Sequence, residues 1–245
     1  MSEQTITWIG HGSWKMTTPA GTVIYLDPWI VGNPVAKITV DDAVKDARIV
    51  CVTHGHNDHI GNSIEICKRS GAVLVTLPDV AAYAALYGIP MDDRGGSVHV
   101  GGSIRQMDCV IRAVNALHYS DVMGYEFDSE GKVVAGSGCC GMIIEPDDGK
   151  SVYFAGDTGL FGDMELIGKL YSPYVSVLPI GDKYVMGVRE AAYAAGLLRS
   201  PIVIPGHYNT FPAIPADTND LARRMEVTAP FSKLVVLAPG ESFTL

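Results

Sequence analysis

The stretch Thr-His-Gly-His-Asn-Asp-His, residues 53–59, places three imidazoles and one carboxylate within seven consecutive positions, directly after a short apolar run. In an extended segment His54 and His56 point to the same face of the chain. Asp58 and His59 follow the turn and open a helix that we expect to start near Ile60. Two of these side chains can therefore face one metal ion, and two can face its neighbour.

A single histidine is more often a surface residue or a hydrogen-bonded core residue than a metal ligand. The cluster is different, because three of the chain's seven histidines fall within six residues. Unbound imidazoles so close together would compete for protons and for hydrogen bonds. Histidine pairs at short spacing carry zinc in other motifs, so the stretch predicts a metal site.

Length and composition favour one globular domain. The 245 residues, 47% of them hydrophobic, allow a single α/β domain over residues 1–245 with a sizeable core. No stretch approaches the roughly 20 apolar residues needed to cross a bilayer. The first residues lack the basic start and long apolar core of a secretory signal, so we expect a cytoplasmic protein without a membrane partner. Five cysteines, with a vicinal pair at Cys139 and Cys140, do not resemble a secreted disulfide framework.

The charge balance bears on the partners of the chain. A formal net charge of −9 argues against a nucleic-acid surface, which needs clustered Lys and Arg. We expect a small-molecule substrate. Bound divalent metals add local positive charge, so an anionic substrate can still bind to an acidic protein. The oligomeric state stays open, and a homo-oligomer is one of the alternatives.

The pattern of apolar residues predicts blocks of strands that alternate with mixed α/β segments. Two sheets back to back, each covered by helices, accommodate this order. The longest irregular stretch, residues 119–138, follows His118 directly, and such a long loop is often functional. We expect strands at 4–9, 14–18, 21–26, 48–53, 71–77, 97–100, 103–109, 111–117, 140–145, 151–155, 174–178, 201–204 and 233–238. We expect helices at 41–47, 62–69, 79–87, 163–170, 188–199 and 218–227.

Three further ligand-type residues stand where an apolar run stops, namely His118, Asp157 and His207. Strand ends of this kind converge on one rim of a sheet. Glycines at 156 and 206 let the backbone bend tightly beside two of them. Each residue alone has another interpretation, because a lone histidine is often not a ligand and an aspartate before Thr-Gly is usually a turn residue or a helix cap.

Taken in order, residues 53–59, His118, Asp157 and His207 resemble the motifs of the metallo-β-lactamase superfamily over nearly the whole chain. The segments 10–13, 27–29, 179–182, 186–187 and 204–212 resemble a branch of metal-dependent hydrolases that is similar to the ascorbate-6-phosphate lactonases. The resemblance implies the fold class α/β, as a four-layer αββα sandwich of two mixed β-sheets.

The resemblance also implies a set of ligands. Asp27, which ends the third strand, would orient the histidine loop without binding metal, and its alternative role is a turn residue before Pro28. Imidazole and carboxylate ligands favour two zinc ions, although manganese or iron would accept the same set. One ion would be held by His54, His56 and His118, the second by Asp58, His59 and His207, with Asp157 bridging them.

Other positions are weaker candidates. His11, between two glycines after a strand, either lines the substrate pocket or occupies a turn. Lys183 and Tyr208 are candidate substrate contacts, and each has a structural alternative. His99 alternates with valines along an expected strand and is expected to be exposed and without function.

Two departures from the family pattern lie beside the expected pocket. Gly206 stands where related sequences often have methionine, and residues 125–138 form a somewhat extended segment. These departures bear on the identity of the substrate and not on the metal site.

The function implied is a dinuclear metal-dependent hydrolase that uses a metal-bridging hydroxide to cleave a small ester, lactone or phosphoester, with Asp58 as the catalytic group that orients the water or moves a proton. A glyoxalase II type thioesterase and a β-lactam hydrolase are the nearest rivals, and a tRNA nuclease would need a basic extension that is absent. Outside hydrolysis, the alternatives are a non-catalytic metal-binding or sensor protein and an iron-dependent oxidoreductase on the same fold.

Overall fold

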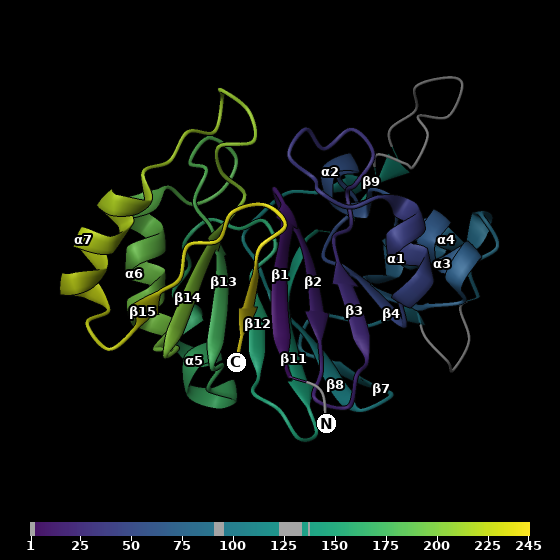
Figure 1. The fold of residues 1–245 in the computed structure, drawn as a ribbon, viewed down its shortest axis with the longest axis horizontal. Helices are drawn as coiled ribbons and strands as arrows, with labels where there is room; N and C mark the ends of the chain where they lie inside the picture. The colour runs from purple at the N-terminus through teal and green to yellow at the C-terminus, as the bar shows by residue number, and fades with distance from the viewer. Residues whose placement is uncertain (1–2, 91–95, 123–133, 137) are drawn as a thin grey trace.

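Two seven-stranded mixed sheets form the centre of the molecule (Figure 1). The computed structural model describes residues 3–90, 96–122, 134–136 and 138–245. The first sheet consists, in spatial order, of β16 (Ser242–Thr244), β1 (Thr5–Gly10), β2 (Ser13–Thr17), β3 (Val23–Leu26), β4 (Ile49–Val52), β5 (Val73–Thr76) and β6 (Gly96–Ser97). The second consists of β15 (Lys233–Leu234), β14 (Ile202–Gly206), β13 (Val175–Pro179), β12 (Val152–Phe154), β11 (Cys140–Pro146), β8 (Cys109–Asn115) and β7 (Ser103–Gln106).

Each sheet joins an antiparallel half to a parallel half. Strands β3 to β6 are parallel in the first sheet, and β12 to β15 are parallel in the second. The remaining neighbours pair antiparallel. The parallel halves matter for function, because the carboxyl ends of parallel strands all reach the same edge of a sheet.

Helices cover the outer faces of both sheets (Figure 1). On the first sheet lie α1 (Val40–Asp46), α3 (Ser63–Ser70) and α4 (Pro78–Leu86). On the second lie α5 (Met164–Tyr171) and α6 (Val188–Leu198), with α7 (Thr218–Thr228) packed against α6. The expected four-layer αββα sandwich is confirmed. Among the described residues, no helix is long and apolar enough to cross a membrane.

Strand β4 shows how the sequence specifies these layers. Its alternate residues Ile49 and Cys51 pack in the core between the two sheets. Val50 and Val52 pack on the opposite face, under the helices. Because both faces are buried, the strand is a continuous apolar run without polar alternation. Cys51 is fully buried, as core packing requires.

All six predicted helices are confirmed to within two residues, but several predicted strands are shorter than expected, and 97–100 and 233–238 lose the largest share of their length. The segment 97–100 leaves the sheet after β6, because Gly102 N–H bonds to the His99 carbonyl at 2.8 Å and turns the chain. His99 is exposed in this turn and not in a strand. The segment 233–238 ends its pairing early because the chain crosses to the first sheet, where Gly240 N–H bonds to the Trp8 carbonyl at 2.6 Å.

The segment 119–138 is described only in part. Strand β9 (Asp121–Val122) pairs with β10 (Val134–Ala135), and most of the extended segment predicted at 125–138 lies outside the described residues. Strand β9 comes so close to the histidine motif that a Cβ on Gly55 would lie 2.7 Å from the Asp121 carbonyl oxygen. This contact brings β9 to the edge of the site.

The packing of α6 on α7 generates a stability prediction. A Cβ at Gly196 would lie 2.4 Å from the Thr228 carbonyl oxygen, which belongs to backbone and cannot move aside cheaply. We expect Gly196→Ala to lower the free energy of unfolding by about 1–3 kcal/mol, despite the better helix propensity of alanine. Chemical denaturation measures the change. Gly162→Ala, which meets nothing within 4 Å, is the matched control, and equal stability of the two variants would contradict the prediction.

Candidate metal centre

The candidate ligands gather at the edge where parallel strands end. Asp27 follows β3, the 53–59 motif follows β4, Asp157 lies beyond β12 and His207 follows β14. The short helix α2 (Asn57–Ile60) and β9 lie above this edge (Figure 1). Side chains from both sheets therefore meet over one place on the molecule.

The helical turn within the motif begins earlier than expected. Helix α2 starts at Asn57 and not near Ile60, so that Asp58 and His59 lie inside it. His56 precedes the turn with extended backbone angles. The turn closes at Gly61, where a Cβ would lie 2.5 Å from Trp29 Cα. This close approach needs glycine and fixes the motif against the end of β3.

One group of ligand atoms consists of three ring nitrogens. His56 Nδ1 lies 3.0 Å from His54 Nε2 and 3.4 Å from His118 Nε2. Asp157 Oδ2 lies 3.7 Å from His118 Nε2. One ligand atom from each of these four residues fits within 4.8 Å of all the others. The structure thus brings together the four residues that the resemblance assigns to the first ion.

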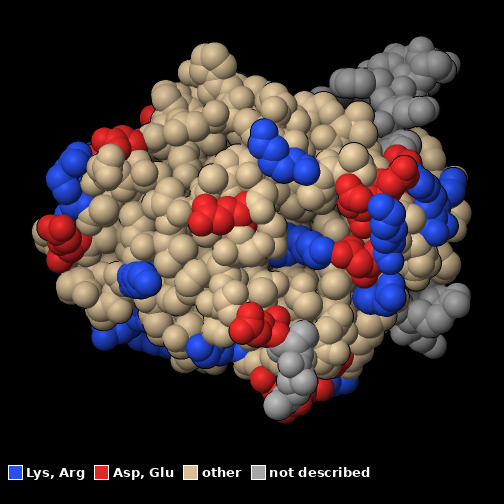
Figure 2. Space-filling view, viewed as in Figure 1, with Lys and Arg blue, Asp and Glu red and all other residues tan. Residues whose placement is uncertain are grey.

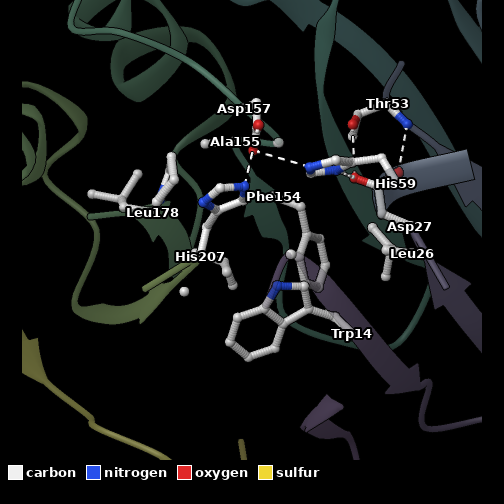
Figure 3. A pocket seen from close by; sticks show the side chains of 15 residues that line it. Trp14, Leu26, Asp27, Thr53, His59, Phe154, Ala155, Asp157, Leu178 and His207 are labelled. Carbon is white, nitrogen blue, oxygen red and sulfur yellow. Dashed lines mark hydrogen bonds and ion pairs between the residues drawn. The ribbon is translucent and has the colours of Figure 1, made fainter. Parts of the chain in front are cut away.

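A second group lies on the other side of Asp157. Its carboxylate oxygens are 3.2 Å from His59 Nε2 and 3.3 Å from His207 Nε2, and Figure 3 shows both rings turned towards it. Asp58 Oδ2 lies 3.8 Å from each of the same two nitrogens. Asp157 therefore stands between the two groups, at the position expected for a bridging ligand.

Several of these buried atoms lack a hydrogen-bond partner. In the part of the chain that the structure describes, His59 Nε2, Asp157 Oδ1 and His207 Nε2 lie at ion-pair distances but form no hydrogen bond. Unsatisfied buried polar atoms are rare and costly. A cation at their centre would satisfy all three, and a mixed imidazole and carboxylate set suits zinc, manganese or iron. The residues present therefore fit a bound metal.

Asp27 holds the histidine motif in place. One oxygen accepts a hydrogen bond from the Thr53 N–H at 2.7 Å, and the other accepts from the Thr53 hydroxyl at 2.7 Å. The second oxygen also lies 2.8 Å from His59 Nδ1 (Figure 3). A ring whose Nδ1–H is held by a carboxylate presents an unprotonated Nε2 to a metal. Asp27 thus touches His59 and not the metal position.

Two further side chains orient the first group, and sequence reasoning had not identified either of them in this role. His54 Nδ1 lies 2.9 Å from the Thr53 hydroxyl, and His56 Nε2 lies 3.3 Å from Asp121 Oδ1. The only sequence signal for Asp121 is an acidic residue shortly after His118. That signal is weak, because no periodic pattern fixes where the 119–138 segment packs.

Gly206 is explained by its neighbour Trp14. A Cβ at this position would lie 2.7 Å from Trp14 Cζ2, so the indole occupies the space where a larger residue would extend. Trp14, Phe154 and Leu178 line a cavity of about 20 Å³ beneath Asp157 and His207 (Figure 3). That volume matches about one water molecule, so the floor of the site is closely packed and largely apolar.

The electrostatics of the two groups differ. Burial lowers the pKa of His54 well below its usual value and also lowers the pKa of His118. Burial acts in the same direction on His207, but the Asp157 and Asp58 carboxylates together outweigh it and raise the pKa of His207 to about 9. Asp157, Asp58 and Asp27 together raise the pKa of His59 well above its usual value, against burial. Without metal, the second group binds protons instead.

The three candidate substrate contacts have different surroundings. His11 is 1% exposed, its Nε2 lies 2.9 Å from Asp58 Oδ2, and burial lowers the pKa of its ring to about 4. Lys183 is exposed, and its ammonium lies 5.0 Å from the Tyr184 ring centroid. Tyr208 is buried and stacks on Trp8 at 5.3 Å, so the structure does not bring its ring to the opening of the site. The left-handed backbone of His207, with φ of 53°, turns the next side chain into the core.

Comparison with known proteins agrees with this geometry. Residues 5–207 match the family model described as a beta-lactamase superfamily domain. The chain belongs to the metallo-β-lactamase superfamily. A metal-dependent hydrolase of Methanopyrus kandleri is 40% identical over 238 residues, which cover 97% of this chain and 98% of the relative. A metal-dependent hydrolase of Koribacter versatilis is 36% identical over 242 residues, which cover 98% and 97%.

A solved structure supports the same assignment. Igni18, described as a novel metallo hydrolase from the hyperthermophilic archaeon Ignicoccus hospitalis, superposes with a TM-score of 0.84 at 35% identity, over 100% of this chain and 99% of that one. These relatives confirm two predictions, the superfamily and the enzyme class, which is metal-dependent hydrolase. The narrower similarity to ascorbate-6-phosphate lactonases stays a prediction.

The raised pKa of His207 generates a prediction about pH. A metal ion and a proton compete for its Nε2, and with a pKa of about 9 the metal-free ring is protonated at neutral pH. Metal affinity should therefore rise by up to about tenfold per pH unit for each proton displaced, until pH reaches about 9. Metal analysis after dialysis at about pH 5 and about pH 8 tests this. Equal metal content at both pH values would count against the prediction.

The contacts of Asp27 generate a second prediction. Asp27→Asn keeps the size of the side chain but replaces one of the two carboxylate oxygens, which accept from Thr53 and hold His59, with an amide group that donates. His59 should therefore lose its fixed orientation. We expect metal affinity to fall about 10–100-fold, measured by competition with a chromophoric chelator. Asp148→Asn, in an exposed turn, is the control. The proposed role of Asp27 is wrong if both variants bind metal as tightly as the unmodified protein.

Proposed function

We propose that this superfamily member is a dinuclear hydrolase that cleaves a small ester, lactone or phosphoester. The observation that supports it most is the position of Asp157, whose carboxylate stands between two groups of ring nitrogens. In the second group, His59 Nε2 and His207 Nε2 form no hydrogen bond within the described residues. The first ion would be held by His54, His56 and His118, the second by Asp58, His59 and His207, and Asp157 would bridge them.

A pair of divalent ions, when bound by such groups, lowers the pKa of a shared water from ~15.7 towards ~7 and polarises a carbonyl or phosphoryl oxygen. Zinc fits this ligand set best, with manganese and iron as alternatives. The metal reconstitution that tests the activity also compares these three metals.

Asp58 has the surroundings of a group that exchanges protons with water. Its side chain is 28% exposed, whereas the side chains of His59, Asp157 and His207 are each less than 5% exposed. Burial alone would raise the pKa of Asp58, but the nearby His59, the hydrogen bond from His11 and the His207 ring at 3.8 Å hold it below its usual range. Asp58 is therefore a carboxylate at neutral pH and can accept a proton from water.

A small substrate is favoured by the charge of the surface. The formal net charge is −9. On the face shown in Figure 2, Lys and Arg are interspersed with Asp and Glu and form no continuous basic stripe. Nucleic-acid binding needs clustered basic side chains. A nuclease activity is therefore the weaker proposal.

Metal reconstitution with a substrate panel tests the proposal. The protein is loaded with zinc, manganese or iron and incubated with p-nitrophenyl esters, lactones and phosphodiesters. We expect two ions per chain and turnover of one substrate class. Asp157→Ala and His56→Ala should each lose metal and lower activity by more than about 100-fold, beyond the usual effect of an outer partner.

His99→Ala is the matched control, because His99 is exposed and lies outside the cluster of the other six histidines. This variant should keep both metal and activity. One ion per chain, or full activity in Asp157→Ala, would refute the dinuclear mechanism. Two ions without any turnover would favour a binding or sensor role, and oxygen uptake by the iron form would favour an oxidoreductase.

A further inference from the structure

His11 occupies a strained position in the turn between β1 and β2. Its φ is 56°, in the left-handed region that non-glycine residues rarely adopt, and such strain tends to cluster at functional sites. Its carbonyl oxygen accepts hydrogen bonds from Trp8 Nε1 at 2.8 Å and from the His207 N–H at 2.9 Å. The backbone of His11 is therefore fixed to the chain just beyond the end of β14, where His207 lies.

The ring of His11 is partnered at both nitrogens. Nε2 lies 2.9 Å from Asp58 Oδ2, and Nδ1 lies 2.9 Å from the Thr210 hydroxyl. The two neighbouring histidines differ, because the Nε2 atoms of His59 and His207 form no hydrogen bond within the described residues. His11 is close enough to be a fifth protein ligand of the second ion, but its satisfied nitrogens indicate another role.

The partners define which nitrogen carries the hydrogen. The Asp58 carboxylate can only accept, so Nε2 of His11 is the donor. Nδ1 is then an acceptor, and the Thr210 hydroxyl donates to it. The other acceptor near that hydroxyl, the Tyr208 carbonyl, is farther away at 3.5 Å. The hydrogen bonds therefore run in one direction, from Thr210 through His11 to Asp58.

Two aromatic rings enclose this chain of hydrogen bonds. Trp29 and Phe211 meet the His11 ring edge-on, with centroids 5.2 and 5.5 Å away. Rings in these positions limit the access of water to the His11 side chain, and a hydrogen bond in a less polar environment is stronger. Asp58, which is partly exposed, is thus held from its buried side.

We propose that His11 is a positioning residue, which holds Asp58 Oδ2 towards His59 and His207 through the hydrogen-bonded chain Thr210–His11–Asp58. The proposal rests on the proposed function for its catalytic consequence. Without His11, the Asp58 carboxylate can rotate towards solvent, so the second ion and the water that Asp58 orients both lose a fixed partner. Thr210 acts only through His11.

Four variants test the chain of hydrogen bonds. Thr210→Val removes the hydroxyl at constant shape, and Thr210→Ser keeps it. His11→Gln keeps a donor near the position of Nε2, and His11→Ala removes it. We expect Thr210→Val and His11→Ala to lower kcat and the affinity for the second ion by about 10–100-fold, with KM and the first ion unchanged. Thr210→Ser and His11→Gln should retain most of both.

A double variant tests whether Thr210 acts through His11. In the His11→Ala background, Thr210→Val should cause no further loss of kcat or of second-ion affinity. The effects of substitutions at contacting residues in one hydrogen-bond network do not simply add. His99→Gln is the control for His11→Gln. Additive losses, or a fall in thermal stability with kcat and second-ion affinity unchanged, would overturn the proposal.

A crystal structure of the zinc-loaded protein separates positioning from ligation. A zinc–nitrogen bond is about 2.0–2.1 Å long, so an ion at that distance from His11 Nε2 would make His11 a ligand and overturn the proposal. If the unmodified protein hydrolyses nothing while Thr210→Val still weakens the second ion, the proposed function fails and the positioning role stands.

Discussion

The hydrogen bonds of Asp27 are the constraint on which the metal centre depends. This carboxylate accepts from the backbone and the hydroxyl of Thr53 and lies against His59 Nδ1. It therefore joins the end of β3 to both ends of the histidine motif. Because the Thr53 hydroxyl donates to Asp27, it can accept from His54 Nδ1, and so one carboxylate sets the orientation of a histidine in each group.

The two sheets bring distant parts of the chain together at the site, which the contacts of Asp27 alone do not do. The motif follows a parallel strand of the first sheet, while Asp157 and His207 follow parallel strands of the second. Burying carboxylates and imidazoles together costs free energy unless each charge is compensated. The apolar floor around Trp14 makes that compensation a requirement, and cations bound by the two groups would provide it.

The sequence allows prediction of features that depend on neighbours along the chain. The motif, the six helices and the run through β4 fall in this class, because period and spacing specify them directly. Asp121, Thr210 and the orientation of Tyr208 do not, because each depends on a turn or on a distant segment. Tyr208 follows His207 and looked available to substrate, yet the left-handed backbone of His207 sends its ring into the core.

In the second group, hydrogen-bond partners distinguish the candidate ligands from the supporting residue, although the three rings lie close together. In the described residues, His59 Nε2 and His207 Nε2 are unpartnered, whereas both nitrogens of His11 are satisfied. Charge adds a second distinction. Burial lowers the pKa of His54 and His118, so their rings are neutral and ready to bind an ion, while the carboxylates around His59 and His207 favour protons there. The two groups are therefore not equivalent, since an ion would bind to the first without displacing protons from these rings and would bind to the second in exchange for protons.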